Sequence, residues 1–541
     1  MGDNNNFMAL PPFRGGGGGG RSGGGRQIWR GGGGNRNWRG GPRGQFQRDG
    51  GRHRGGRGRG RNGNNYGRDF RGGRGGRGGG RGRNLSFGAG SEIFEEVGTP
   101  TESSVTIAVE GCCHGELDSI YERIRSHEEK SGQKVDLLIC CGDFQSIRHP
   151  VDFHSFAAPP KYRNLGSFHQ YYSGVKKAPI LTLFVGGNHE NSQQLQELYY
   201  GGWVAPSIYY LGAAGVVRFK GIRIGGISGI FKGQHYRLGH FERPPYNPST
   251  LRSVYHARIL EVFRLKCLDN QARRLDAMVS HDWPQGIENH GNTRYLLSRK
   301  PFFRSEVEQN CLGSPANHEV LQALRPKLWF AAHLHVGFRA TVNFSATTTS
   351  KATVTDLVPS QLKHSEGSPS SKKDKMTSNS AEGTDDTQRK QGDSQSSSAS
   401  VNVCQPVSTQ EQIEQSTKFI SLDKCLPGRH FLSIAHIEPL QTETNEAAQL
   451  EYDPEWLAIL RKTHEITEAG NQNQHIPTDL MVVTSKEVEW VEQQLESRNK
   501  DKDGSALAIP DNFSITVPPA PADGARQTRN LPSPLPMMGN P

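Results

Sequence analysis

The chain has 541 residues, of which 33% are hydrophobic and 66 are glycine, and its formal net charge is +11 at pH 7. So low an apolar content means that the folded part is much shorter than the full chain. Residues 1–90 contain 19 Arg, three Asp, no Lys and no Glu, hence a charge of +16, which leaves −5 for the rest. The basic pI therefore describes an N-terminal segment and says little about the partners of the remaining chain.

The eight cysteines show no CxxC spacing, which argues against a zinc ribbon or a disulfide scaffold and favours reduced thiols in the cytosol or nucleus. No apolar run approaches the roughly 18 residues that span a bilayer, and the N-terminus lacks the apolar core of a signal peptide. We therefore expect a soluble intracellular protein with no membrane partner. The sequence predicts no oligomeric state.

Residues 1–98 are a Gly/Arg/Asn-rich segment with RGG and RGRG clusters. Such a composition cannot bury enough apolar surface to offset the entropy of ordering, so we predict a disordered tail. Arginine contacts phosphates and stacks on bases, and sparse aromatic residues add stacking, which favours general RNA binding. A solvated linker or a methylated tail with another role is the alternative. The aromatic residues within the Arg/Gly clusters include Trp29, Trp38, Phe46, Tyr66 and Phe70.

Residues 103–344 alternate between strand and helix patterns and predict an α/β layer fold with buried strands. Ligands in such folds gather at the carboxyl ends of the strands. Helices are predicted over 116–130, 251–268 and 318–325. Strands are predicted over 104–111, 135–142, 178–187, 222–229, 276–281 and 327–336.

Three segments complete the domain plan. Residues 345–415 are rich in Ser, Thr, Lys and Gln without aromatic residues, and are predicted to be a disordered insert. Residues 416–500 regain strand and helix patterns, either as a separate domain or as additions to the catalytic one. Residues 501–541 are Pro-rich and predicted to be a disordered tail.

Polar side chains follow five of the predicted strands. A lone histidine is more often a packing or surface residue, but five such segments in order favour one common site. His333 and His335 carry most weight, because residues two apart on a strand point to the same face. The full set is Cys112, His114, Asp143, Asn188, His189, His281, His333 and His335.

These residue types suit a dinuclear metal site for phosphate hydrolysis. Such a site needs a carboxylate that bridges two cations, imidazoles that fix the metals, and open positions for water and substrate. Asp143 can bridge because a carboxylate has two oxygens. The neutral histidines leave charge on the metals to polarise the phosphorus centre.

The order of GCCH, GD, GNHE, a later His and HLH resembles the calcineurin-like metallophosphoesterase superfamily, a sandwich of two β-sheets flanked by helices. Within it, the chain is similar to the RNA lariat debranching family, which hydrolyses the 2′-5′ phosphodiester at the branch point of excised introns. The similarity covers roughly residues 104–344 and, more loosely, 416–465. It rests on GCCHGELDSIY, LLICCGDFQSIR, LTLFVGGNHE, LQELYYGGWVAPSIYYLG, GIRIGGISGIFK, VSHDWP and AHLHVGF.

The resemblance implies two metal pockets that share Asp143. One would use Cys112, His114 and His335 as its other ligands, and the second Asn188, His281 and His333. His189 would not bind metal, and would protonate the leaving 2′ oxygen or hold the phosphate. One or two divalent ions per chain are expected, namely Fe(II), Zn or Mn.

Cys112 has three interpretations. The wider superfamily usually has Asp at this position, whereas debranching enzymes resemble this chain in having Cys. We favour a metal ligand, with packing without ligation as the alternative and a covalent nucleophile as the least favoured. A thiolate is a soft ligand that suits Fe(II) or Zn over Mg or Mn, which puts full occupancy of that pocket in doubt.

The segment 233–256 is too long for a simple connection and resembles the lariat recognition loop of the family. Its aromatic residues are expected to stack on unpaired bases and its basic residues to meet phosphates. A solvated loop packed by its own aromatics is the alternative. The candidates are His235, Tyr236, Arg237, Phe241, Arg243, Tyr246 and Arg252.

The expected function is metal-dependent debranching of intron lariat RNA in the nucleus, with shuttling to the cytoplasm as a variant. Two enzymatic alternatives are a protein phosphatase and a DNA nuclease of the same superfamily. The phosphatases are expected to carry an Arg-containing GDxxDRG motif, where this chain has GDFQSIR. The third alternative is an RNA-binding protein whose phosphoesterase domain is inactive, supported by the Arg/Gly tail.

Overall fold

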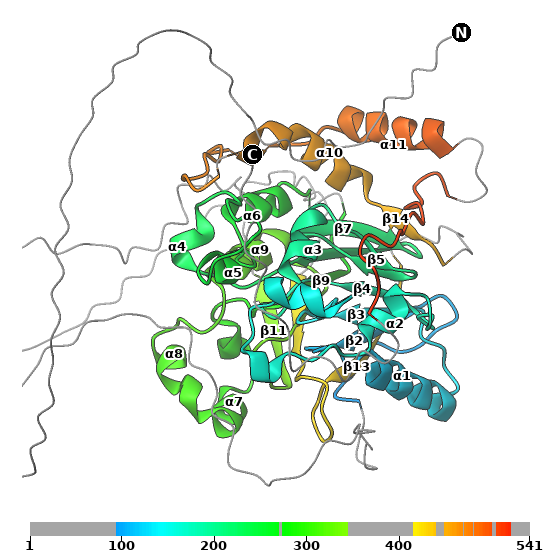
Figure 1. Ribbon diagram of the computed structural model, residues 1–541, viewed down its shortest axis with the longest axis vertical. Helices are drawn as coiled ribbons and strands as arrows, with labels where there is room; N and C mark the ends of the chain where they lie inside the picture. Colours follow the sequence, from blue (N-terminus) through cyan, green and yellow to red (C-terminus); the bar gives the residue numbers. More distant parts are fainter. Residues whose placement is uncertain are drawn as a thin grey trace, which may run out of the picture. The chain divides into compact units, whose positions relative to one another are not determined.

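The computed structural model describes residues 93–269, 273–344, 415–439, 448–468, 470–479, 481–499 and 505–520. They form two seven-stranded sheets with helices on the outer faces (Figure 1). One apolar cluster joins the inner faces, since Ile107 and Ile139 of the first sheet pack with Ile224 and Phe330 of the second. The predicted sandwich of two sheets flanked by helices is confirmed.

The first sheet has a parallel centre, β2–β3–β4–β6, with antiparallel or short strands at its edges. The central strands are buried on both faces, which explains why they appear in the sequence as continuous apolar runs. In spatial order the strands are β1 (Glu96–Val97), β13 (Leu432–Ile437), β2 (Val105–Glu110), β3 (Leu137–Cys140), β4 (Leu181–Phe184), β6 (Ile208–Tyr210) and β5 (Gly202–Ala205).

The second sheet repeats this plan, with β8, β9, β10 and β12 parallel and antiparallel strands outside them. The parallel strands of both sheets therefore offer their carboxyl ends to the loops that carry the predicted ligands. In spatial order the strands are β11 (Phe338–Phe344), β12 (Gln415–Ser421), β10 (Leu328–Ala331), β9 (Ala277–Ser280), β8 (Ile222–Ile227), β7 (Ala214–Phe219) and β14 (Leu450–Tyr452).

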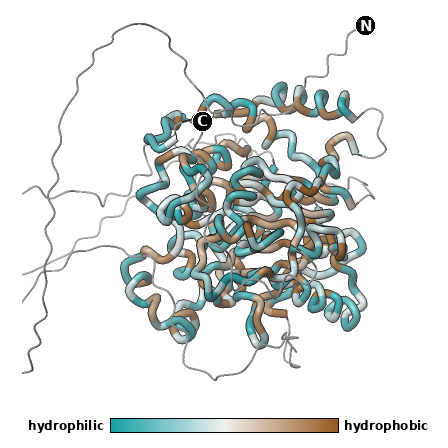
Figure 2. The backbone as a smooth tube through the Cα atoms, viewed as in Figure 1, coloured by the Kyte–Doolittle hydropathy of each residue, from teal (hydrophilic) through white to brown (hydrophobic). Residues whose placement is uncertain are grey.

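Helix α1 presents an apolar face to the first sheet and a polar face outward (Figure 2). In α1, Leu117, Ile120 and Ile124 are buried at helical spacing, and Gly132 ends the helix in a left-handed conformation (φ 74°) that glycine adopts without strain. The α-helices are α1 (Leu117–Ser131), α2 (Phe168–Tyr172), α3 (Ser192–Glu197), α4 (Gly233–Tyr236), α5 (Thr250–Ser253), α6 (Ile259–Lys266), α7 (Thr293–Arg299), α8 (Arg304–Glu308), α9 (Pro315–Leu324), α10 (Pro454–Lys462) and α11 (Ser485–Asn499).

The predicted helix over 251–268 is wrong as one element, because the structure divides it into α5 and α6. Between them the backbone is extended: His256 forms a β-bridge with Ile230, and the N–H of Ala257 donates to the carbonyl of Ile230. Arg258 then starts α6, and its backbone N–H donates to the Glu261 carboxylate at 3.1 Å. This tertiary contact with the strand end overrides a helical pattern that is locally continuous.

Two segments predicted to be disordered are partly ordered. Strand β1 lies inside the predicted tail 1–98 and pairs with β13. Residues 505–520, inside the predicted tail 501–541, contact both sheets. Ala508 forms a β-bridge with Glu451 of β14 in the second sheet. Tyr172 Oη, beside the first sheet, accepts the N–H groups of Thr516 and Val517 at 2.8 Å. The rest of both tails and the insert up to residue 414 lie outside the described residues. In the part of the chain that the structure describes, no helix is long and apolar enough to span a bilayer.

The segment 416–500 is built into the sandwich. Strand β12 lies between β10 and β11 of the second sheet, while β13 lies between β1 and β2 of the first. Asp453, fully buried, caps α10 through the N–H of Trp456 and accepts two bonds from the buried Arg223 guanidinium, at 2.7 and 2.8 Å. Burial raises the pKa of Asp453, but the charges of Arg223 and Arg218 outweigh it and hold that pKa at about 2.

Replacing Asp453 by Asn should destabilise the fold by about 3 kcal/mol, because it removes the fully buried carboxylate that pairs with Arg223 and leaves that charge to the more exposed Glu455. The contribution of the wild-type carboxylate is present above pH 4 and is lost as the pH falls toward 2, because the folded-state pKa is the depressed one. Urea unfolding measures the effect. The matched control is Glu487→Gln, whose pair with Lys462 is only partly buried and should cost below about 1 kcal/mol. Equal losses in the two variants would contradict the assignment.

Candidate metal centre and substrate loop

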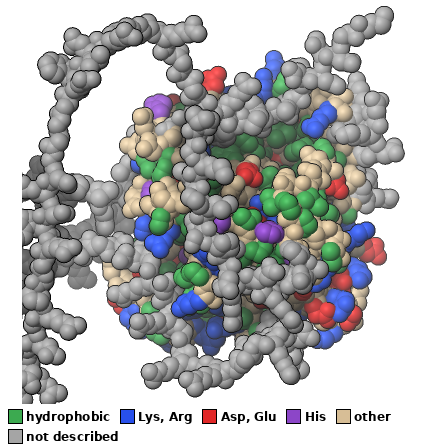
Figure 3. All heavy atoms as spheres, viewed as in Figure 1, with side chains coloured by type: hydrophobic (Ala, Val, Ile, Leu, Met, Phe, Trp, Pro, Cys, Tyr) green, Lys and Arg blue, Asp and Glu red, His purple; other side chains and the backbone are tan. Residues whose placement is uncertain are grey.

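Five loops at the carboxyl ends of parallel strands carry the predicted ligands. Three follow β2, β3 and β4 in the first sheet, and two follow β9 and β10 in the second. Because the two sheets are stacked, the loops meet at one rim. In the space-filling view, histidine side chains reach the surface near the middle of the face shown (Figure 3).

The first predicted pocket has four possible ligand atoms close together. Cys112, His114, Asp143 and His335 each place one such atom within 4.8 Å of the others. Nε2 of His114 lies 3.7 Å from Oδ2 of Asp143. This is the geometry expected where several side chains surround a single cation, and the donors are imidazole, thiol and carboxylate.

The residues predicted for the second pocket surround the other oxygen of Asp143. Nε2 of His281 lies 3.4 Å from Oδ1 of Asp143 and 3.2 Å from Oδ1 of Asn188. Nδ1 of His333 lies 3.2 Å from the same His281 nitrogen. Asp143 therefore stands between the two groups, with one carboxylate oxygen toward each.

The backbone at this rim adopts a conformation that side chains with a Cβ rarely take. His114, Asp143, His333 and His335 all have positive φ angles, between 47° and 59°. Such left-handed residues concentrate at functional sites because the surrounding structure must compensate their cost. The strand expected over 327–336 is corrected accordingly: β10 ends at Ala331, so a turn and not strand alternation aims the two histidines.

Two glycines allow the loops to approach so closely. A Cβ on Gly187 would lie 2.3 Å from Oδ1 of Asp143, and one on Gly142 would lie 2.4 Å from Nδ1 of His281. Only a residue without a side chain fits at either position. Steric crowding thus explains why glycine precedes Asp143 and Asn188 in the sequence.

Burial sets the protonation states that a metal site needs. It raises the pKa of Asp143 by itself, but His281, His189 and His114 around the carboxylate outweigh it and hold that pKa below its ordinary value. Burial lowers the pKa of His333 to about 4 and that of His335 to about 2. At neutral pH the centre therefore offers an ionised carboxylate and neutral imidazoles, the forms that bind cations.

The hydrogen bonding of the histidine nitrogens also fits a metal ion. Nε2 of His114 and Nε2 of His335 are buried without a hydrogen-bond partner, which is costly unless another group satisfies them. Nδ1 of His281 donates to the carbonyl of Cys141 at 2.8 Å, which leaves its Nε2 with a free lone pair. A divalent ion would satisfy these nitrogens.

Cys112 faces this centre from a fully buried position. Burial raises the pKa of its thiol well above the ordinary value, and the Asp143 carboxylate raises it further. The backbone N–H of His333 donates to its sulfur at 3.3 Å. The thiol is therefore neutral unless a cation displaces its proton, which disfavours a free thiolate nucleophile and leaves ligation or packing.

His189 lies beside the metal centre. Its backbone N–H donates to Oδ1 of Asp143 at 2.8 Å, and its ring centroid lies 5.9 Å from that of His114. The next residue, Glu190, was not singled out from the sequence, although GNHE contains it. Its carboxylate accepts the N–H groups of Phe144, Gln145 and Gly187 at 2.8 to 2.9 Å, and so joins the loops after β3 and β4.

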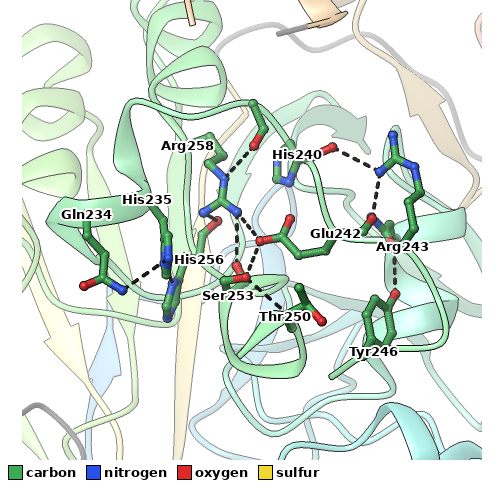
Figure 4. Close-up of polar contacts among 12 residues, drawn as sticks. Gln234, His235, His240, Glu242, Arg243, Tyr246, Thr250, Ser253, His256 and Arg258 are labelled. Atoms are coloured by element: carbon green, nitrogen blue, oxygen red, sulfur yellow. Dashed lines mark hydrogen bonds and ion pairs between the residues drawn. The ribbon is translucent and has the colours of Figure 1, made fainter. Parts of the chain in front are cut away.

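The segment 233–258 is organised around an ion pair without solvent exposure (Figure 4). Nη2 of Arg258 donates to Oε1 of Glu242 at 2.7 Å and to the carbonyl of Ser253 at 3.2 Å, and the Ser253 hydroxyl donates to the same carboxylate. His235 and His256 contact each other through their Nδ1 atoms, 2.7 Å apart. This internal network argues against a simple solvated loop.

The predicted substrate residues have different placements. Arg237, Arg243 and Arg252 are exposed, and His235, Phe241 and Tyr246 are partly exposed. Tyr246 donates to Gln196 at 2.6 Å. Tyr236 is 9% exposed and its ring packs against Phe231, so base stacking by Tyr236 is corrected to packing, because the apolar layer beneath α4 covers its ring.

This rim, with a shared aspartate between two groups of histidines on a two-sheet sandwich, defines a metallophosphoesterase. The sequence model of the calcineurin-like phosphoesterase family matches residues 105–337, and that of the lariat debranching enzyme C-terminal domain matches residues 414–541. The latter match fits the observation that β12 and β13 are part of the sandwich.

Three similar proteins indicate which family of metallophosphoesterases the chain belongs to. The chain is 41% identical over 447 residues to the lariat debranching enzyme of Schizosaccharomyces pombe, covering 77% of this chain and 90% of the relative. It is 45% identical to the enzymes of Danio rerio and Homo sapiens, over 76% of this chain in each case. The matched part spans 61% and 63% of the length of those two relatives. The chain belongs to the lariat debranching enzyme family.

Replacing Asp143 by Asn should lower metal occupancy at least about tenfold, because a neutral amide cannot supply charge to two pockets. Metal content after anaerobic reconstitution with Fe(II) or Zn would measure this. Asp118→Asn is the control, since Asp118 lies on α1 and pairs with Lys176 and Tyr171 outside the site. Wild-type metal content in the Asp143 variant would remove this residue from the ligand set.

Proposed function

We propose that this protein hydrolyses the 2′-5′ phosphodiester at the branch point of excised intron lariats and so releases linear RNA. The observation that carries the proposal is the position of Asp143, with Oδ2 toward His114 and Oδ1 toward His281. Membership of a family whose relatives are lariat debranching enzymes supplies the substrate class.

In the ligand set of this proposal, Cys112 restricts which metal ion the first pocket can bind. Cys112 with His114 and His335 favours a borderline or soft cation such as Fe(II) or Zn, while the oxygen and nitrogen donors of the second pocket also suit Mn. A divalent ion bound here supplies Lewis acidity, which lowers the pKa of water and withdraws charge from the phosphate. Asp143 and the neutral histidines hold it without cancelling its charge.

His189 supplies the proton for the leaving group in this proposal. Its ring stands between that of His114 and that of Phe156, with centroids at 5.9 and 6.3 Å, while its backbone is fixed by Asp143. An imidazole so placed can protonate the ribose 2′ oxygen as the bond to phosphorus breaks. The products are a 5′-phosphate and a free 2′-hydroxyl.

A panel of branched RNA, linear RNA, DNA and phosphopeptide tests the proposal against the related phosphatases and nucleases. Debranching predicts preferential hydrolysis of the 2′-5′ bond of branched RNA. Preference for phosphopeptide or DNA would replace the proposal with one of those activities. Binding of branched RNA without turnover of any of the four, in metal-loaded protein, would favour the RNA-binding alternative.

Replacing His189 by Ala should reduce turnover of branched RNA by about 10²-fold or more while metal content and RNA affinity stay near wild type, because only the proton donor is removed. Single-turnover kinetics with metal analysis measures the three quantities. His154→Ala is the control, since His154 is exposed on the neighbouring 3₁₀ turn Pro150–Ser155. Turnover unchanged by the His189 substitution would exclude it from the mechanism.

We also propose that the Arg/Gly-rich tail raises local RNA concentration without setting specificity. The net charge of +16 over residues 1–90 supports salt-dependent phosphate contacts. Deletion of residues 1–91 leaves β1 intact and should lower RNA affinity at low salt, with unchanged preference for branched over linear RNA. Competition binding at two salt concentrations gives both values. A changed preference would contradict this division of roles.

A further inference from the structure

Lys424 lies beside the candidate metal centre, although it comes from the C-terminal part of the chain. The N–H of Cys112 donates to the carbonyl of Asp423 at 3.3 Å, and the N–H of Cys425 donates to the carbonyl of Cys112 at 3.2 Å. These two bonds form an isolated parallel bridge that pairs Lys424 with Cys112. The loop after β12 therefore runs next to the loop that bears the first predicted ligands.

The alternation of the backbone places the Lys424 side chain on the same side as that of Cys112. Leu422 belongs to the apolar cluster between the two sheets, which also contains Cys112, whereas Cys425 belongs to the cluster beneath α1. Side chains alternate along an extended segment, and residues paired across a bridge point to the same face. Lys424 thus projects toward the rim where His114 and His335 lie.

The bridge holds the Lys424 backbone beside Cys112, whose sulfur lies within 4.8 Å of donor atoms of His114, Asp143 and His335. An ammonium group so close to cation ligands repels a metal ion. The position of Lys424 therefore does not favour metal binding by itself. It favours binding of an anion, because both the ammonium group and a metal ion attract one.

Lys424 has no acidic partner among the residues that the structure describes. The adjacent carboxylate, Asp423, is engaged by Arg429 at 3.1 Å and by the backbone N–H of Lys424 itself at 2.8 Å. Lys424 is partly exposed, and its ammonium forms no ion pair or hydrogen bond within the described ranges. It is available to a ligand from solvent.

Further cations gather around the same loop. Burial lowers the pKa of Lys300, which follows α7, and Asp423 opposes this lowering. The positive charges of Arg429, Lys424 and Arg299 lower it further, so these side chains lie within electrostatic range of Lys300. Together with the Arg429–Asp423 pair, these positive charges near the loop after β12 suit a polyanion.

We propose that Lys424 binds a backbone phosphate of the RNA substrate at the edge of the metal centre, on the side of Cys112 and His335, with Lys300 adding to the local field. The inference rests on the proposed function and names a residue that distinguishes a polynucleotide from a small phosphodiester. An ammonium group binds phosphate as a point charge and carries no base specificity. Lys424 thus positions the RNA strand, while the metal centre and His189 act on the scissile bond.

The test is Lys424→Met in the full metal-loaded chain, which keeps an unbranched stem and removes the charge. For branched RNA, KM should rise about tenfold with kcat changed less than about threefold, and the slope of log affinity against log salt should fall by about one. Hydrolysis of bis(p-nitrophenyl) phosphate should stay at the wild-type rate, and metal content should be at or above the wild-type value, because a repelling charge is removed. Lys424→Arg, which retains the charge, should restore KM to within about threefold.

Lys418→Met is the matched control, because it removes the same charge from an exposed position on β12 in the same segment. It should leave both substrates unaffected. Equal loss of activity on RNA and on the small diester in Lys424→Met, loss of its metal, or an unchanged KM for branched RNA would overturn the inference. If the wild-type chain cleaved the small diester but not branched RNA, the proposed function would fail instead, independently of Lys424.

Discussion

One carboxylate shared between two groups of ligands is the constraint on which the site depends. Asp143 leaves the end of β3 with a positive φ of 47° and sends one oxygen toward His114 and the other toward His281. This arrangement requires the rims of both sheets to meet within a few ångströms. The apolar cluster between the sheets fixes that distance, and Gly142 and Gly187 remove the side chains that would prevent it.

Residues around Asp143 also hold the loops of this rim in place. Glu190 joins the loops after β3 and β4 by accepting three backbone N–H groups. The carbonyl of Cys141 orients His281 by accepting its Nδ1 proton. Burial raises the pKa of the Cys112 thiol well above its ordinary value, so the thiol is neutral at neutral pH. These contacts orient the centre through groups of the chain itself.

The C-terminal region takes part in this organisation. Strands β12 and β13 enter different sheets, and Asp453 neutralises a buried arginine of β8. Because the loop after β12 pairs with Cys112, a segment that follows a long insert reaches the reaction centre. On the other side of the rim, the Arg258–Glu242 pair gives the substrate segment a fixed interior. The RNA surface proposed here thus draws on both halves of the sandwich.

The sequence by itself determined an α/β layer fold and the ligand candidates, because buried parallel strands leave continuous apolar runs and their ends leave polar residues in a recognisable order. The two-sheet sandwich came from the resemblance to the metallophosphoesterases. The sequence placed the strand ends at Glu110 and Cys140 to within two residues, but extended the strand that ends at Ala331 by five. It did not determine the break between α5 and α6, the burial of Tyr236, the ordering of 505–520 or the position of Lys424. Each of these depends on contacts between residues far apart in the chain, and such pairings leave no local periodicity.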